Sequence, residues 1–430
     1  MRRIIVLAIA LFAIGCSSHP SAVPAPGEIS PAIFQKHLDK NGWVVTPIDP
    51  IDGYQALPGS LAVDNQHKMW VAAEPNGNDP KGGGELVKIL MNGHQSRYPL
   101  SVLPGGLVFG PDGNMWVSGF DKSSGASVIA RVTLNGQETD YPLNLPTGLQ
   151  AGSLILGSDD AFWFNSCNNA GTSGGIGRID TSGISTFYPG SCASVIASGP
   201  DSNIWFGDAG QNIYKMNTQG TVLATYPVGE QFFNDLKAGT DGTLYLAAID
   251  NFNNSPDLIR VTTAGVVTKI GGDGYGDGYL SILSGPDGNI WISGAHSASS
   301  DLIQYNVTSQ SFGQRVRGPK HAGSGLANGP DGNIWASAPY SSAVDTFVIQ
   351  VMTVTPKTLT VSVGKSANLT AGEANYSGTW TAVSTKPSIA TVTANSNNGK
   401  FTVKGVSAGT TIVAVYDSMY NSVEAKVTVH

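Results

Sequence analysis

A unit of roughly 45 residues recurs along most of this chain, and such a repeat restricts the fold more than any other feature of the sequence. Each copy has a short apolar run, a turn rich in Gly, Pro, Asp and Asn, and a second run with one large aromatic residue. The aromatic residues are Trp70, Trp116, Trp163, Trp205, Tyr245, Trp291 and Trp335. Their spacings of 46, 47, 42, 40, 46 and 44 residues match one four-stranded blade of a β-propeller. We therefore expect an all-β chain built on a seven-bladed β-propeller.

The sixth copy shows how one unit divides into strands. Leu280–Ser284 is the expected inner strand, residues 285–289 form a tight turn, and Ile290–Ile292 is the second strand. Residues 294–300 are expected to be a loop before the third and fourth strands at Leu302–Val307 and Ser311–Val316. Proline and glycine favour the turn because proline presets φ and glycine tolerates positive φ. The aspartates of these turns, which we interpret as structural and not as metal ligands, are Asp112, Asp201, Asp287 and Asp331.

The seventh copy lacks a fourth strand, which would leave a sheet edge exposed. Its expected strands are Leu326–Asn328, Ile334–Ser337 and Thr346–Val351. Trp43–Pro47, before the first copy, resembles a fourth strand without a blade. We expect it to complete the seventh blade and close the ring, the alternative being an extended leader. The propeller is thus expected to occupy residues 43–351.

Residues 352–430 form a separate module of alternating strands with Gly and Asn turns, which predicts a β-sandwich. The segments Leu359–Gly364, Pro387–Val392 and Gly405–Thr411, with Trp380 between the first two, resemble bacterial Ig-like group 2 domains. That resemblance implies a spacer or adhesive unit.

The N-terminus is typical of an export signal. Arg2 and Arg3 precede the apolar stretch Ile4–Ile14, and the segment ends in Cys16 within a sequence that resembles a bacterial lipobox. We expect residues 1–16 to be a lipoprotein signal and Cys16 to carry lipid, so that the chain is anchored in the cell envelope, at the outer membrane of a Gram-negative host. A plain secretory signal with an incidental cysteine is the alternative. Residues 17–42 are an expected tether, with a short helix over Ala32–Lys40.

Two further cysteines, Cys167 and Cys192, suggest one disulfide in an oxidising compartment, the alternative being two free thiols. Cys167 is expected in a loop after a second strand and Cys192 in a crossover between blades, which places both on one face.

Charge is unevenly distributed along the chain. Residues 17–351 hold 16 Lys and Arg against 28 Asp and Glu, a net charge of −12, whereas residues 352–430 hold 6 against 3, a net charge of +3. The acidic main body argues against nucleic acid, which requires a basic surface. We expect a monomer with an envelope or extracellular ligand.

The segment Gly-Pro-Asp-Gly-Asn-Ile-Trp, at 285–291 and 329–335 and nearly so at 110–116, is similar to the repeat of the virginiamycin B lyase family. That resemblance implies a seven-bladed propeller that opens a cyclic depsipeptide antibiotic by elimination with a metal ion, usually magnesium. The family repeat usually continues Trp-Phe-Thr-Glu, but here only Glu74 remains, one position later than expected. The acidic lining that the family repeat would supply is therefore thin, and the fold alone does not fix the activity.

The loops after the second strands and the crossovers between blades share one face of a propeller. The polar residues expected on that face are Glu74, Asp121, Asp208, Glu230, Asp250, Asp273, Tyr275, Asp277, His296 and His321. By analogy His296 and His321 are the candidate proton carriers, because elimination needs an acid and a base. Asp273 and Asp277 are candidate ligands for magnesium or calcium, which prefer oxygen. The alternative for the histidine is a solvated loop residue, and the alternative for the two aspartates is a plain flexible crossover. The sequence by itself does not require a cofactor.

Three functions remain open on this sequence: an anchored propeller that binds a ligand on the loop-rich face, a magnesium-dependent carbon–oxygen lyase, and a structural envelope component. The thin acidic lining, the tether and the adhesin-type module favour the binding protein.

Overall fold

The structure is a computed structural model. It describes residues 43–48, 55–76, 83–90, 94–121, 123–209, 211–230, 232–249, 255–275, 278–296, 299–317, 325–338, 342–347, 353–373, 378–417 and 422–430. These residues form strands and turns, and no α-helix occurs among them. Accordingly, this part of the chain contains no helix long and apolar enough to cross a bilayer. The predicted helix over Ala32–Lys40, the signal segment and Cys16 lie outside the described residues.

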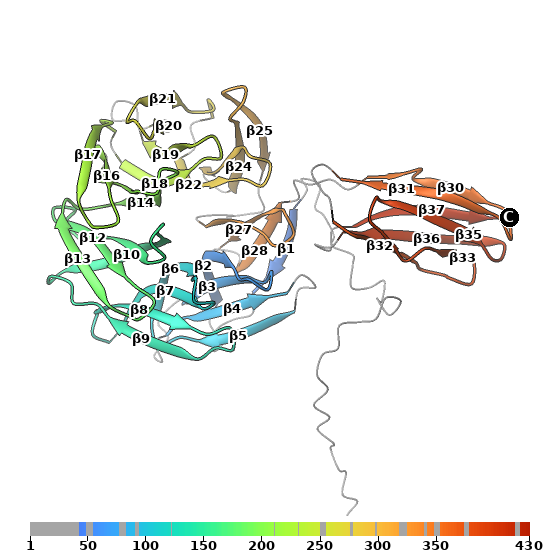
Figure 1. Cartoon of the computed structure of the whole chain (residues 1–430), viewed down its shortest axis with the longest axis horizontal. Coiled ribbons are helices and arrows are strands. Elements are labelled where there is room, and N and C mark those ends of the chain that lie inside the picture. The colour runs from blue at the N-terminus through green and yellow to red at the C-terminus, as the bar shows by residue number, and fades with distance from the viewer. Residues whose placement is uncertain are drawn as a thin grey trace, which may run out of the picture.

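Four-stranded antiparallel sheets follow one another along the chain and are arranged around a ring (Figure 1). In each sheet, consecutive strands lie side by side from the centre of the ring outward. The first sheet contains β2 (Gln55–Val63), β3 (Met69–Asn76), β4 (Glu85–Ile89) and β5 (Gln95–Pro99), and the second contains β6 (Leu103–Phe109), β7 (Met115–Phe120), β8 (Ser127–Val132) and β9 (Glu138–Pro142). The third contains β10 (Leu149–Leu156), β11 (Phe162–Asn168), β12 (Gly174–Ile179) and β13 (Ser185–Gly190), and the fourth contains β14 (Val195–Ser198), β15 (Ile204–Gly207), β16 (Asn212–Met216) and β17 (Val222–Pro227). The fifth contains β18 (Phe232–Ala238), β19 (Thr243–Ile249), β20 (Pro256–Thr262) and β21 (Val267–Gly271), and the sixth contains β22 (Gly278–Ser284), β23 (Ile290–His296), β24 (Ser299–Asn306) and β25 (Ser311–Arg317).

The last sheet of the ring combines both ends of this region. It has the order β1-β28-β27-β26, with β1 (Trp43–Pro47), β26 (Leu326–Asn328), β27 (Ile334–Ala338) and β28 (Ala343–Phe347). Trp43 lies opposite Phe347, and Pro47 opposite Ala343. The pairing predicted for Trp43–Pro47 is therefore confirmed. Trp335 and Val344 of this sheet share an apolar cluster with Met69 and Val71 of the first sheet, so the first and last sheets pack together.

The repeated turn is held by hydrogen bonds between residues close in sequence. In the sixth sheet of the chain, Trp291 Nε1 donates to Asp287 Oδ1 over 3.0 Å, and Asn289 Nδ2 donates to Asp287 Oδ2 over 2.9 Å. Gly288 adopts a φ of 78°, which glycine tolerates at little cost. A side chain at Gly285 would collide with the Trp291 ring, since its Cβ would lie 2.4 Å from Cδ1.

The same aspartate–aromatic hydrogen bond recurs around the ring, with lengths of 2.8 to 3.0 Å. The pairs are Asp64–Trp70, Asp112–Trp116, Asp159–Trp163, Asp201–Trp205, Asp241–Tyr245, Asp287–Trp291 and Asp331–Trp335. The structural role predicted for Asp112, Asp201, Asp287 and Asp331 is confirmed.

Each aromatic residue of the second strands is buried and belongs to an apolar cluster that joins neighbouring sheets. Trp116, fully buried, packs with Leu154 and Phe162 of the next sheet. The packing expected between blades is therefore confirmed. Burial of aromatic side chains of this size contributes a large share of the apolar stabilisation.

The tyrosines of the outer strands form a second contact between sheets. Tyr188 stacks on Trp163 of its own sheet, with ring centroids 5.8 Å apart. Gly220, in the turn between β16 and β17, has a φ of 83°, and a Cβ there would lie 2.0 Å from the Tyr188 ring. The same tyrosine–glycine contact recurs at Tyr98–Gly136, Tyr141–Gly183 and Tyr226–Gly265.

Several strand boundaries differ from those predicted. The expected loop over 294–300 is largely absent, because β23 continues to His296, which pairs with Ser299 at the start of β24. The third strand of the seventh copy is β28 at Ala343–Phe347, earlier than the expected Thr346–Val351. Glu74 and Cys167 also lie inside strands, not in the loops that follow them. In β3, β11 and β23 antiparallel pairing extends the strand through residues whose polarity favoured a loop.

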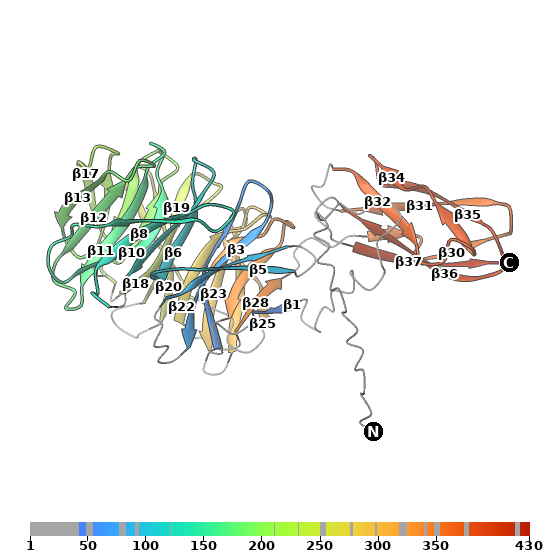
Figure 2. The same ribbon diagram turned by 90° about the horizontal axis from the view of Figure 1, so that it is seen from below.

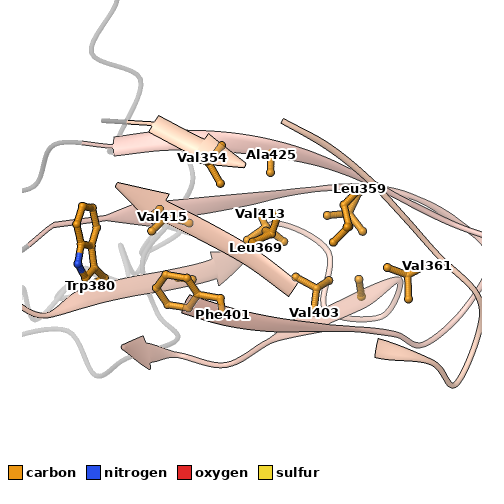
Figure 3. Close-up of a cluster of buried hydrophobic side chains, with 14 of the residues drawn as sticks. Val354, Leu359, Val361, Leu369, Trp380, Phe401, Val403, Val413, Val415 and Ala425 are labelled. Carbon is orange, nitrogen blue, oxygen red and sulfur yellow. The ribbon is translucent and has the colours of Figure 1, made fainter. Parts of the chain in front are cut away.

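The C-terminal part forms two sheets packed through one apolar core, called here the C-terminal sheet pair (Figures 1 and 2). One sheet has the order β29-β31-β35-β33 and the other β30-β37-β36-β32-β34. The strands are β29 (Thr353–Thr355), β30 (Thr358–Val361), β31 (Ser366–Gly372), β32 (Trp380–Ser384), β33 (Ala390–Val392), β34 (Asn395–Ser396), β35 (Lys400–Gly405), β36 (Gly409–Tyr416) and β37 (Ser422–Val429). Leu369, Phe401 and Val413 lie at the centre of the core (Figure 3).

Candidate functional site

The crossover face is defined here as the face that carries the ends of the second strands and the crossovers between sheets. Its polar side chains come from strand ends or short connections, which a rigid sheet holds in place. Of the predicted site residues, the structure describes Glu74, Asp121, Asp208, Glu230, Asp273 and Tyr275 on this face. It describes only the backbone of His296. Asp250, Asp277 and His321 lie outside the described residues.

Glu74 lies near the end of β3 and pairs across the ladder with Leu57. Its side chain is half-buried, and burial raises the pKa of this carboxyl above its ordinary value. This direction moves the pKa of Glu74 toward the range useful for proton transfer.

Asp121 and Asp208 are each held by groups of their own loop. Asp121 Oδ1 accepts hydrogen bonds from the hydroxyls and backbone N–H groups of Ser123 and Ser124, which lower its pKa to about 2. Asp208 accepts from the N–H groups of Gln211 and Asn212 and, through Oδ2, from the Tyr214 hydroxyl at 3.0 Å. Both carboxylates therefore shape local turns.

Glu230 and Asp273 lie in crossovers and are engaged by cations. Glu230 is fully buried and forms an ion pair with Lys269 of the outer strand β21. Asp273 forms an ion pair with Arg315 of β25, and the Tyr279 hydroxyl donates to its Oδ1 over 3.3 Å. The described half of the predicted Asp273–Asp277 metal pair thus already has a guanidinium partner.

Arg315 connects this crossover with Asp301 of β24. Its Nε donates to Asp301 Oδ2 over 2.7 Å, and its guanidinium carbon lies 4.2 Å from the centre of the Tyr275 ring. A cation over an aromatic face is attractive, and here it fixes the ring while leaving Tyr275 68% exposed. Sequence reasoning missed Arg315, because only the fold brings it near a crossover 42 residues earlier.

Cys167 in β11 and Cys192 in the crossover after β13 form a disulfide, as predicted. Cys192 is buried and Cys167 is partly buried. The bond ties the third sheet to the connection that leads into the fourth, on the crossover face.

Exposed apolar side chains also occur on this face. Phe232 begins β18 and is 54% exposed, and Leu280 of β22 is 36% exposed. Together with Tyr275 they are called here the apolar rim. The two sheets that carry the rim are adjacent, since Asn234 Nδ2 donates to the backbone oxygen of Tyr279 over 2.7 Å.

The innermost strands contain bulges, and the residues in these bulges differ from sheet to sheet. Strands β2, β6 and β10 each skip two small residues in their pairing, whereas β18 skips Asn234 and β22 skips Leu280. The small residues are Gly59, Ser60, Gly105, Gly106, Gly152 and Ser153. Bulges redirect side chains and occur often beside binding sites. The inner strands on one side of the ring thus carry small residues in their bulges, whereas those on the other side carry Asn234 and Leu280.

The described residues do not fit a magnesium site. No three His, Cys, Asp or Glu side chains among them lie together as a metal would require. Asp121 and Asp208 accept local hydrogen bonds, and Glu230 and Asp273 face cationic side chains.

The sequence profile described as the Virginiamycin B lyase family matches residues 50–228 and 102–271, which together span more than half of the chain. The chain belongs to the virginiamycin B lyase family. A streptogramin B lyase structure shares 18% identity with it at a TM-score of 0.56, over 71% of this chain and 96% of that one. No curated protein matches the sequence significantly.

Two further structures show the same fold. A catalytically inactive histidine-to-alanine variant of virginiamycin B lyase from Staphylococcus aureus, solved with quinupristin, has a TM-score of 0.57 and 18% identity, over 71% of this chain and all of that one. The extracellular domain of a hybrid two-component system from B. thetaiotaomicron has a TM-score of 0.52 and 13% identity, over 90% of this chain and 58% of that one. These likenesses support a β-propeller of the virginiamycin B lyase type. At such low identity they show the fold alone.

Proposed function

We propose that the chain is an exported lipoprotein of the cell envelope whose seven-bladed propeller binds a ligand on the crossover face. The C-terminal sheet pair serves as an Ig-like spacer or adhesion unit, and the protein acts as a monomer. The apolar rim is the observation that carries this proposal. Phe232, Tyr275 and Leu280 are exposed on adjacent sheets, whereas four of the carboxylates on the same face are engaged by neighbouring groups.

Such a lining suits a ligand with apolar or ring surfaces and few cationic groups. Ligand sites are mostly apolar, with a small number of polar groups that set orientation. The Arg315 guanidinium lies against the Tyr275 ring and holds it in place, so the ring offers a fixed apolar surface.

The binding proposal is tested with quinupristin as the probe, by calorimetry on the chain from Ser17 onward. Tyr275→Ala and Leu280→Ala should each weaken binding about tenfold, in proportion to the apolar area removed. Ile184→Ala is the matched control, because Ile184 is 67% exposed but follows the turn between β12 and β13, on the opposite face. No binding by the parent protein, or equal loss in the control, would contradict the proposal.

A carbon–oxygen lyase is the second candidate, and membership of the virginiamycin B lyase family favours it. The raised pKa of Glu74 adds one group suited to proton transfer on the crossover face. An elimination assay on quinupristin with added magnesium, run beside His296→Ala, separates the candidates. Turnover that depends on His296 would establish the lyase function. Binding without turnover would support the ligand-binding function instead.

The anchor is tested separately by Cys16→Ser. If Cys16 carries lipid, the substitution should move the protein from the membrane fraction to the soluble fraction and abolish incorporation of labelled fatty acid. Retention of both properties in the variant would rule out this anchor.

A further inference from the structure

The end of the C-terminal sheet pair marked C in Figures 1 and 2 brings together three connections and the last strand. Val363 N–H donates to the backbone oxygen of His430, and Gly364 N–H donates to that of Gly405. Val406 N–H donates to the backbone oxygen of Ile389. This end, called here the distal tip, therefore comprises residues 362–365, 386–389, 404–408 and 429–430.

Among Asp, Glu, Lys and Arg, the distal tip contains only lysines. Lys365, Lys386 and Lys404 are exposed, and the described residues of the tip include no Asp or Glu. The three acidic residues of the sheet pair lie toward its other end. Glu373 follows Gly372, which pairs with Thr353 at the start of the sheet pair. Asp417 directly follows the end of β36, and Glu424 pairs with Ala414 in the far half of that strand.

Those acids are too far away to neutralise the tip. Ala414 lies five residues along β36 from Gly409, which is roughly 16 Å at the rise of an extended strand. The Debye length is about 8 Å at physiological ionic strength, so the acids are largely screened from the tip. The tip is a local basic surface on a chain with a net charge of −7.

The same tip exposes two large apolar side chains. Val363 is 50% exposed and Val406 is 44% exposed, and the residues around them are small, including Gly364, Ser407 and Ala408. The bridge between Val363 and Gly405 and the hydrogen bond from Val406 hold both valines on rigid backbone beside the lysines. A soluble polyanion would engage the lysines only and leave the valines in water.

We propose that the distal tip docks on an anionic phospholipid surface. The lysines contact lipid phosphates while Val363 and Val406 enter the boundary between head groups and acyl chains. Basic residues near an anionic leaflet contribute about 1 kcal/mol each, and shallow apolar insertion adds to this attraction. The contact is weak, reversible and sensitive to salt, so the tip acts as an auxiliary attachment.

The test is co-sedimentation of the chain from Ser17 onward, without lipid at Cys16, with large vesicles of equal parts phosphatidylglycerol and phosphatidylcholine. Binding should exceed that to pure phosphatidylcholine and fall as salt is raised. Lys365→Gln and Lys404→Gln should each weaken partitioning about fivefold, the equivalent of the contribution of one lysine. Lys426→Gln is the matched control, since Lys426 is exposed on β37 near the middle of the strand and away from the tip.

The valines decide between a lipid surface and a soluble polyanion. Val363→Ser with Val406→Ser should weaken vesicle binding several-fold and leave elution from a heparin column unchanged. Val222→Ser, at an exposed valine of β17, controls for general loss of apolar surface. The proposal is overturned if the anionic lipid gives no preference, if the tip valines have no effect on vesicle binding, or if Lys426→Gln weakens it as much as the tip lysines do. Unchanged melting of the variants excludes unfolding as the cause.

Discussion

Trp291 donates its indole N–H to Asp287 in the preceding turn over 3.0 Å while its ring packs between two sheets of the propeller. One residue thus closes the turn of its own sheet and fills the space beside the next. Because the pair recurs around the ring, each sheet uses the same local contact to orient the aromatic group that joins it to its neighbour.

Trp291→Ala should lower the free energy of unfolding by roughly 3–5 kcal/mol, because it empties a fully buried aromatic site and leaves Asp287 without its indole donor. Urea denaturation followed by circular dichroism measures the effect. An effect below about 1 kcal/mol would contradict the packing role of this side chain.

Gly220→Ala should destabilise the propeller more than Gly229→Ala. Both glycines have positive φ, 83° and 76°, so both substitutions incur similar backbone strain. The Cβ at Gly220 would lie 2.0 Å from the Tyr188 ring, whereas nothing lies within 4 Å of a Cβ at Gly229. We expect the difference between the two melting experiments to correspond to about 1–3 kcal/mol, the usual cost of overpacking. Equal effects would mean that the tyrosine moves away freely.

Acid should destabilise the ring through the turn aspartates. Burial alone would raise the pKa of Asp287, but hydrogen bonds from Asn289 and Trp291 more than offset it, and the pKa is lowered. Asp112, Asp159 and Asp201 have lowered pKa values for similar reasons. Their stabilisation is complete above the unfolded-state pKa of about 3.9 and is lost as the pH falls further. Melting temperature measured from pH 6 to pH 2 should decline steeply below about pH 4, and less steeply in Asp287→Asn.

The C-terminal sheet pair should respond to pH in the opposite sense. Burial and the nearby carboxyl of Asp417 raise the pKa of Glu373 to about 7. The folded state therefore binds more protons than the unfolded state between about pH 4.5 and 7, so stability falls as the pH rises through this window. Glu373→Gln should flatten the profile and raise the melting temperature at pH 8, as measured by calorimetry. A parent profile that is flat from pH 5 to pH 8 would contradict this result.

Loss of the disulfide should destabilise the third and fourth sheets. The bond closes a loop with a sequence separation of 25, for which chain entropy predicts a contribution of about 3 kcal/mol. Cys167→Ala with Cys192→Ala should lower the melting temperature by several degrees, and a reductant should lower that of the parent only. If reductant has no effect on the parent, the bond contributes little.

The turn–aromatic pairs were predictable because their partners are four to six residues apart, and the repeat displays them several times. The tyrosine–glycine contacts were not, since Tyr188 and Gly220 belong to different sheets. The candidate site divides in the same way into local features, which the repeat predicts, and contacts between distant segments, which it does not. The positions of Asp121 and Asp208 at the crossover face follow from the repeat, but their engagement in local turns does not. Arg315 behind Tyr275 became visible only once the outer strand was placed beside the crossover.

The pairing of β1 with β28 also determines how the ring responds to mechanical load. Trp43 faces Phe347, so the chain enters and leaves the propeller at the same end of one antiparallel pair. A pull between the segment before Trp43 and the segment after Phe347 would separate these strands one hydrogen-bonded pair at a time, as a zipper opens, and would hardly stretch the other sheets. Tension along the polypeptide would therefore release β1 first, at low force, while the remaining sheets stayed folded.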